Sequence, residues 1–166
     1  MRNTLIFLMM AMIILAACQP KPKTVPVDTA AAKDSVSTLL DKFNSAMKAK
    51  DANTIAALIT EDGLICGTDP SEFWDKSRFV EEWKKAAADT SVKFTYSIDK
   101  QEIRIASDGN SAIAIEQAIL ASLSPKIPFR LVYHAVKTGD KWLIDFASWN
   151  FIPKNEDIPK LNKALE

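Results

Sequence analysis

The chain has 166 residues, and its 21 basic and 21 acidic side chains leave no net charge at neutral pH. This balance lacks the positive charge that marks nucleic-acid-binding domains, so we expect no nucleic acid among its partners. One histidine and two cysteines are too few for a clustered metal site, and the four glycines form no phosphate-binding loop, so no cofactor is expected.

The first eighteen residues predict a lipoprotein signal. Arg2 precedes an uncharged apolar run over residues 5–17, which is shorter than the roughly 20 residues that a membrane-spanning helix needs. The run ends in LAAC, which resembles the bacterial lipobox. The resemblance implies cleavage before Cys18, acylation of that cysteine, and a domain held in the periplasm at the cell envelope, with Gln19 favouring the outer membrane. The alternative is an ordinary signal peptide followed by an incidental cysteine.

The chain after the signal divides into three parts. Residues 18–31 carry the lipidated cysteine and several prolines, and they predict a flexible tether. Residues 32–152 are long enough for one domain with its own core. Residues 153–166 form a C-terminal tail, in which a last helical turn would pack on the domain.

Three amphipathic helices are predicted in the first half of the domain. Over residues 35–49 apolar side chains recur at helical spacing, and the pattern returns over 53–60 and 78–88. A short strand at 64–66 follows the second helix, and the turn-rich segment GTDPSEFWDKS is read as a loop.

After Thr90 the apolar period changes from 3.6 to 2, which is typical of strands. The parity of the apolar residues changes near Lys100, which indicates a break or bulge. Turn sequences at 108–110 and 138–140 separate strands at 111–122, 129–137 and 141–150. We therefore predict an α+β fold in which three N-terminal helices pack on one face of a curved, mostly antiparallel sheet.

This order of elements, with the segments DANTIAALITEDG, GTDPSEFW and TGDKWLIDFASW, resembles the NTF2-like superfamily and, within it, the SnoaL-like branch. The resemblance covers residues 32–152 and implies a cone-shaped domain with a pocket at its wide end. Members include isomerases, dehydratases, cyclases and binding modules, so the fold leaves the function open. Many relatives carry a histidine and a serine on the last strand, where this chain has Ser148 and Asn150. That departure argues against acid–base chemistry.

Alternation along the strands suggests which side chains face the helices. In the strand 111–122 the odd positions are bulky, so Ile113, Ile115 and Gln117 are expected inside. In the next strand Phe129, Leu131 and Tyr133 share the inward parity. Comparison with the kinase-association domains of the superfamily places Gln117, Tyr133 and Trp149 in the pocket. The complete set of predicted ligand-binding residues is Trp74, Tyr96, Gln117, Tyr133, Asp145 and Trp149.

The last strand is ambiguous, because both of its faces are largely apolar. If Asp145 shares the face of Trp149, its carboxyl group points into the cone, where Tyr133 is a candidate partner. His134 then lies on the outer face with Trp142, Ile144 and Phe146. Such an apolar outer face usually needs cover, so a homodimer is expected.

Three functions remain open at this stage. The first is a lipid-anchored, non-catalytic domain that binds a small, largely apolar ligand or a partner protein. The second is an isomerase- or dehydratase-like enzyme that uses Asp145 and Tyr133, both weak catalytic candidates. The third is a structural homodimer with a vestigial pocket.

Overall fold

The structure, a computed structural model, describes residues 28–91 and 93–166. The predicted signal peptide, Cys18 and most of the predicted tether lie outside these residues. Among the described helices, none combines the length and the apolar character needed to cross a membrane. The helical elements are α2 (Thr29–Ala49), α3 (Ala52–Ala57), α4 (Lys76–Ala88), the 3-10 turn η1 (Asn155–Asp157) and α5 (Ile158–Lys163).

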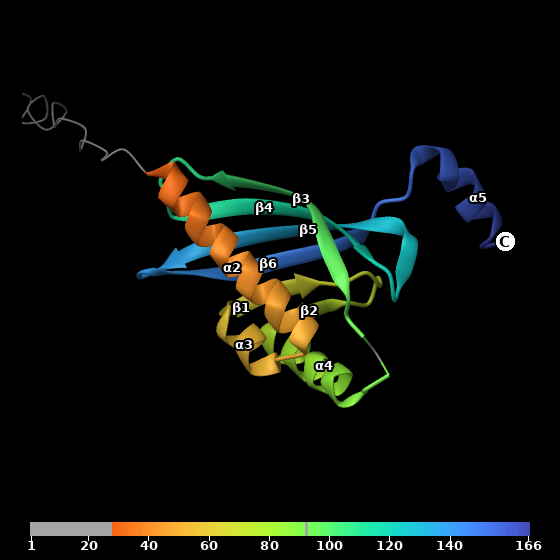
Figure 1. Cartoon of the computed structure of the whole chain (residues 1–166), viewed down its shortest axis with the longest axis horizontal. Coiled ribbons are helices and arrows are strands. Elements are labelled where there is room, and N and C mark those ends of the chain that lie inside the picture. The colour runs from red at the N-terminus through yellow and green to blue at the C-terminus, as the bar shows by residue number, and fades with distance from the viewer. Residues whose placement is uncertain (1–27, 92) are drawn as a thin grey trace, which may run out of the picture.

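The strands are β1 (Ile59–Cys66), β2 (Phe73–Asp75), β3 (Tyr96–Ile105), β4 (Ser111–Leu120), β5 (Ser124–Thr138) and β6 (Lys141–Phe151). They form one sheet in the order β2-β1-β6-β5-β4-β3. The pair β1–β6 is parallel and the other pairs are antiparallel. The long helix α2 crosses the sheet, and α3 and α4 lie at one end of it (Figure 1). The predicted α+β class is confirmed.

Helix α2 begins at Thr29, six residues before the predicted start. The Asp28 carboxylate accepts hydrogen bonds from the backbone N–H groups of residues 30 and 31, and this cap lies upstream of the predicted one. The helix ends at Lys50, whose left-handed backbone (φ 56°) stops the α-helical pattern. The Lys50 ammonium then donates to the carbonyl oxygens of Ala86 and Asp89 and ties the end of α2 to the end of α4.

The inward face of β4 is opposite to the predicted one. Ala112, Ala114, Glu116 and Ala118 are buried, whereas Ile113 and Ile115 are 43% and 37% exposed. The bulk of the side chains misled the prediction, because the buried side of β4 carries alanines and one glutamate while the isoleucines face outward. Asn44 of α2 donates hydrogen bonds to the buried Glu116 carboxylate, which confirms that the even positions face the helix.

Strand β6 contains a β-bulge, which resolves its ambiguous pattern. Ala135 of β5 pairs with Ile144 of β6, whereas the preceding residue of β5, His134, pairs with Phe146. Asp145 is therefore an extra residue in β6. The bulge switches the parity of the strand. The side chains that face the helices are therefore Trp142 and Ile144 before the bulge, and Ala147 and Trp149 after it. The prediction that Trp142 and Ile144 lie on the outer face is wrong for this reason.

The remaining elements differ from prediction mainly at their ends. The helix predicted over 53–60 stops at Ala57, and β1 begins two residues later, so Asp62 and Gly63 belong to a strand. The segment predicted as a loop contains β2, which pairs with the end of β1. The bulge predicted near Lys100 is confirmed by a register shift between Ile98 and Lys100.

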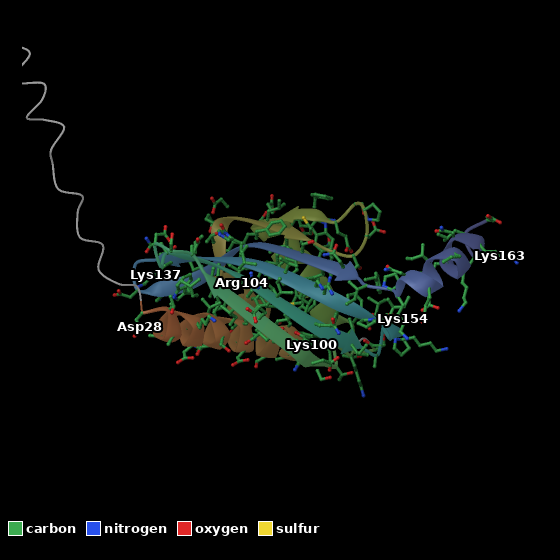
Figure 2. The ribbon with its side chains drawn as sticks, turned by 90° about the horizontal axis from the view of Figure 1, so that it is seen from above. Asp28, Lys100, Arg104, Lys137, Lys154 and Lys163 are labelled. Atoms are coloured by element: carbon green, nitrogen blue, oxygen red, sulfur yellow. The ribbon has the colours of Figure 1, made fainter. Side chains whose placement is uncertain are left out.

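The C-terminal tail forms the predicted helical turn as α5, but it does not pack on the domain. All residues of α5 are exposed, and the helix projects beyond the end of the sheet (Figure 1). Figure 2 shows this from a second direction, with Lys154 at the end of the sheet and Lys163 far out on the tail. The core lies entirely between Val36 and Ala147, so the body of the domain is complete without the tail.

Candidate functional site

A cavity of about 200 Å³ opens at the end of the sheet near α4. Its walls come from α2, α4 and strands β2 to β6, together with the loop between β1 and β2. Most of the lining is aromatic or aliphatic, including Met47, Ala118, Leu120 and Leu131. Thr68 and Glu72 of the loop are polar members, and the Glu72 carboxylate also accepts a hydrogen bond from the backbone of Asp69.

Helix α4 contributes Trp83 to the wall of this cavity, with Phe79 packed behind it. The Asp75 carboxylate caps the helix by accepting from the Arg78 N–H, and that hydrogen bond lowers the pKa of Asp75. Phe79 and Trp83 follow at i and i+4 on the buried face. The Trp83 ring lies 4.7 Å from the ring of Phe94 and 6.5 Å from that of Trp149, centroid to centroid. An aromatic wall results, and Trp74 of β2 extends it.

The two tyrosines of the chain also line the cavity, and one of them belongs to a buried polar network. The Tyr96 hydroxyl donates to Asn44 Oδ1 at 2.8 Å, and Asn44 Nδ2 donates to the Glu116 carboxylate at 3.0 Å. Gln101 Nε2 donates to the same carboxylate at 2.8 Å. Glu116 is 1% exposed and is held by amide donors, which a buried carboxylate requires. The carboxylate does not line the cavity but fixes Tyr96, which does.

Both tyrosine hydroxyls are held in the neutral form. Burial raises the pKa of Tyr96, and the nearby negative charge of Glu116 raises it further. Burial also raises the pKa of Tyr133, again with a contribution from Glu116. The cavity therefore presents phenols, and not phenolates, to a ligand.

Two indole N–H groups beside the cavity lack a hydrogen-bond partner. Among the described residues, three buried side-chain polar atoms have none: Trp83 Nε1, Trp149 Nε1 and Thr60 Oγ1. Trp149 lies beside Tyr133 and slightly lowers the pKa of that phenol. Both indole nitrogens are enclosed by the protein, and unpaired buried donors are rare in folded proteins.

The structure brings together four of the six predicted ligand-binding residues. Trp74, Tyr96, Tyr133 and Trp149 line the cavity. Gln117 does not, because the inward parity of β4 belongs to the even positions, and it lies opposite Arg130 on the outer side. Whether the four residues bind a ligand stays a prediction.

Asp145 was expected to point into the cone, and that expectation is wrong. The bulge turns its side chain to the outer face, where one carboxylate oxygen lies 2.7 Å from Nδ1 of His134. Both side chains are about one-third exposed. His134 lies on the outer face, as the sequence predicted. Because Asp145 and Tyr133 lie on opposite sides of the sheet, they cannot act together on one substrate.

Glu116, Trp83 and Phe94 were not predicted as parts of the site. Trp83 lies in a helical pattern typical of a core residue, and the alternating pattern of β4 assigned Glu116 to the wrong face. A signal was present, since a lone glutamate within the run AIAIEQAIL is unusual in a strand. Within the described ranges, no three histidine, cysteine, aspartate or glutamate side chains are placed to hold a metal ion.

Comparison with solved structures identifies the class of fold. The chain is similar to an uncharacterised protein with a cystatin-like fold from Caulobacter vibrioides, with a TM-score of 0.67 and 14% identity over 82% of this chain and 99% of that one. It is also similar to an NTF2-like protein of unknown function from Pseudomonas putida KT2440, with a TM-score of 0.63 and 16% identity over 78% and 92% of the two chains.

A third similar structure is a putative calcium/calmodulin-dependent protein kinase II association domain from Xanthomonas campestris, with a TM-score of 0.61 and 18% identity over 82% and 99% of the two chains. At these identities the likeness shows the fold alone, which is the NTF2-like cone. The model of the SnoaL-like domain family matches residues 36–146, so the chain belongs to that family. A comparison with curated proteins found no match.

Proposed function

We propose that this protein is a lipid-anchored domain of the bacterial cell envelope that binds a small, largely apolar ligand without catalysis. The observation that carries the proposal is the cavity beside α4, about 200 Å³ in volume and walled mostly by aromatic and aliphatic side chains. An apolar cavity of about 150 Å³ is large enough for benzene, so this one suits a substituted single ring or a molecule of similar size.

The arrangement of polar groups favours binding over catalysis. A general base needs to reach the proton that it removes. The one carboxylate that lines the cavity, Glu72, is engaged by its own loop, and Glu116 is enclosed behind Asn44 and Gln101. The alternative enzyme based on Asp145 and Tyr133 is not retained, because the two side chains lie on opposite sides of the sheet.

The first test is native mass spectrometry of a soluble fragment, residues 24–166, purified under mild conditions from cells of its own species. We expect a co-purifying small mass on the wild-type fragment. The variant Ala118→Phe fills the cavity and should lose that mass, whereas Gln117→Ala, on the opposite side of the same strand, should keep it. A clean apo fragment would contradict ligand binding and favour a partner protein.

The proposed anchor rests on the segment LAAC and the apolar run before it. In cells, acylated Cys18 should hold the protein in the membrane fraction, since two or more acyl chains give stable binding. We expect Cys18→Ser to move the protein to the soluble fraction and to remove the acyl mass from the intact protein. An unchanged intact mass and an unchanged distribution between the fractions would exclude lipidation.

We also propose that two copies pair through the outer face of the sheet, the side away from α2. Two rows of side chains cross four strands on this face: Ile113–His134–Phe146–Leu64 and Ile115–Val132–Ser148–Cys66. Ile113, Ile115 and Leu64 are exposed in the single chain. A largely apolar patch on a sheet suits a two-fold contact with a second copy.

Sedimentation analysis of the 24–166 fragment tests this pairing. We expect a dimer for the wild type and a monomer for the double variant Ile113→Lys and Ile115→Lys, because burying two ammonium groups opposes association. Leu161→Lys on α5 is the matched control and should remain dimeric. A monomeric wild type at high protein concentration would refute the proposal.

A further inference from the structure

Among the described residues, Glu72 is the one charged side chain that lines the cavity. No lysine, arginine or histidine of the described ranges shares that lining. The Lys48 ammonium lies 4.8 Å from the centroid of the Tyr96 ring, but Lys48 is exposed and is not part of the wall. Within these ranges the wall therefore carries one carboxylate and no cation to balance it.

The loop at residues 67–72, between β1 and β2, fixes the position of this carboxylate. Glu72 Oε2 accepts a hydrogen bond from the Asp69 N–H at 3.0 Å, and the Gly67 N–H donates to the Glu72 carbonyl oxygen at 2.9 Å. A Cβ atom at position 67 would overlap the Glu72 carboxylate, so glycine there lets the side chain lie across the loop. The second oxygen, Oε1, makes no hydrogen bond to the described residues and is not one of the enclosed polar atoms, so a ligand can reach it.

The rest of the wall offers little that competes for a polar group of the ligand. Trp83 and Trp149 line the cavity, but their indole nitrogens are enclosed by the protein, so these rings present carbon to a ligand. The Tyr96 hydroxyl already donates its proton to Asn44. Thr68 lies at the wall on the same loop as Glu72, and its hydroxyl can accept as well as donate. The wall thus combines a broad apolar surface with hydrogen-bond acceptors on one loop.

We propose that the ligand is a small organic cation whose protonated amine binds Glu72 and whose apolar body lies among the aromatic rings. This inference rests on the proposed ligand-binding function and names the chemistry of the ligand. An ammonium group donates charge-assisted hydrogen bonds to a carboxylate, whereas an anionic ligand would lose its hydration and meet a like charge. Aromatic rings are also favourable neighbours for a bound cation, because their faces carry a negative electrostatic potential.

Three probes of similar length separate the charge from the apolar body. They are phenethylamine, which is an ammonium ion at neutral pH, propylbenzene, which has a methyl group in that place, and phenylacetate, which has a carboxylate. Binding to the 24–166 fragment is followed by tryptophan fluorescence, since Trp74, Trp83 and Trp149 line the cavity. We expect phenethylamine to bind more tightly than phenylacetate, and its affinity to fall about twofold or more between roughly 0.01 M and roughly 0.15 M salt. The affinity of propylbenzene should not fall with salt.

The variant Glu72→Gln gives a second, independent measurement. Its amide oxygen can still accept from the Asp69 N–H, while the negative charge is lost. We expect it to weaken phenethylamine about three- to tenfold, to change propylbenzene by less than about twofold, and to strengthen phenylacetate. Glu102→Gln is the matched control, because it removes the same charge from a side chain of β3 that is 62% exposed and does not line the cavity. It should leave all three affinities unchanged.

The outcomes distinguish the two levels of the proposal. If propylbenzene binds while phenethylamine does not, or if Glu72→Gln weakens both equally, the amine inference is wrong and the ligand-binding proposal stands. If none of the three probes binds up to its solubility limit, the ligand-binding function fails and the inference fails with it. If Glu72→Gln does not fold, the salt dependence of the wild-type fragment and its preference for phenethylamine over phenylacetate still decide the question.

Discussion

Glu116 is a carboxylate enclosed in the core without a cation, and its environment explains how the domain tolerates it. Two side-chain amides, from α2 and β3, donate to its oxygens, and one of them also holds the Tyr96 hydroxyl. The residue thus links the helix, the sheet and the cavity wall. Such a fully satisfied network specifies one arrangement of the core, since any rearrangement leaves buried polar groups unpaired.

Replacing Glu116 should therefore be costly. We expect Glu116→Ala to lower the free energy of unfolding by about 2–4 kcal/mol, because it leaves a cavity and two unpaired amides. Glu102→Ala is the matched control on the neighbouring strand, where the side chain is 62% exposed, and it should change stability by less than about 0.5 kcal/mol. Urea denaturation followed by circular dichroism measures both. If Glu116→Ala lowers the free energy of unfolding no more than Glu102→Ala does, the network makes no measurable contribution to stability.

The raised tyrosine pKa values predict a loss of stability at alkaline pH. In the unfolded chain both phenols ionise near pH 10, whereas in the native protein burial and Glu116 keep Tyr96 and Tyr133 protonated at higher pH. Above about pH 10 the unfolded state therefore binds fewer protons than the native state. The contribution of these groups is complete below pH 10 and declines as the pH rises above it.

Absorbance of tyrosinate in the near ultraviolet checks this prediction, and the chain has only two tyrosines to titrate. We expect no ionisation of the native protein at pH 10–11 and ionisation of both residues near pH 10 in urea. A native titration that matches the one in urea would mean that the phenols face water.

Strands β4 and β6 show how an element can present an unexpected face. On β4 the alanines are buried in the core and the isoleucines face outward. On β6 one extra residue, Asp145, switches the parity, so that apolar residues before and after it face the same core. In both strands the inward face is defined by the neighbouring elements.

The full burial of Ala114 on β4 predicts an asymmetric response to substitution. We expect Ala114→Leu to destabilise the domain by about 1–3 kcal/mol, because the added methyl groups overpack the core. The adjacent Ile113→Leu, on the outer face, should change stability by less than about 0.5 kcal/mol in the monomeric state. Thermal denaturation of the two variants tests this packing. Equal midpoint temperatures would contradict it.

At the scale of the whole molecule, the structure consists of a cone-shaped body with a projecting tail. The core includes α2, α3, α4 and the sheet, while α5 packs only beside η1 and is exposed throughout (Figure 1). Ile158, Leu161 and Leu165 are apolar and face water. The cavity lies within the body, between α4 and the ends of the strands, so its shape does not depend on the tail.

Removal of the tail should therefore leave the body intact. We expect deletion of residues 155–166 to change the free energy of unfolding by less than about 0.5 kcal/mol. Deletion of residues 28–40, which carry the buried Val36, Leu39 and Leu40, should instead prevent folding. Circular dichroism of both truncated proteins gives the comparison. A loss of more than about 1 kcal/mol on removing the tail would show that α5 packs on the body in solution.

Local sequence was sufficient for the fold class, because hydrophobic periods and turn residues act over a few neighbours. It identified the long helix, the succession of strands, the bulge near Lys100 and the inward side of β5 with Tyr133. Together with the motifs of the SnoaL-like family, it also placed Trp74, Tyr96 and Trp149 at the cavity. The lipid anchor on Cys18 is a prediction from local sequence too.

Only the tertiary structure decided which face of β4 is buried and where the bulge lies in β6. A strand pattern with two apolar faces is compatible with either orientation, and the choice depends on which elements cover each face and on where the extra residue is accommodated. For that reason Asp145 lies beside His134 on the outer face and Glu116 lies in the core. These long-range contacts between elements define the chemistry of the site, and no short stretch of sequence contains them.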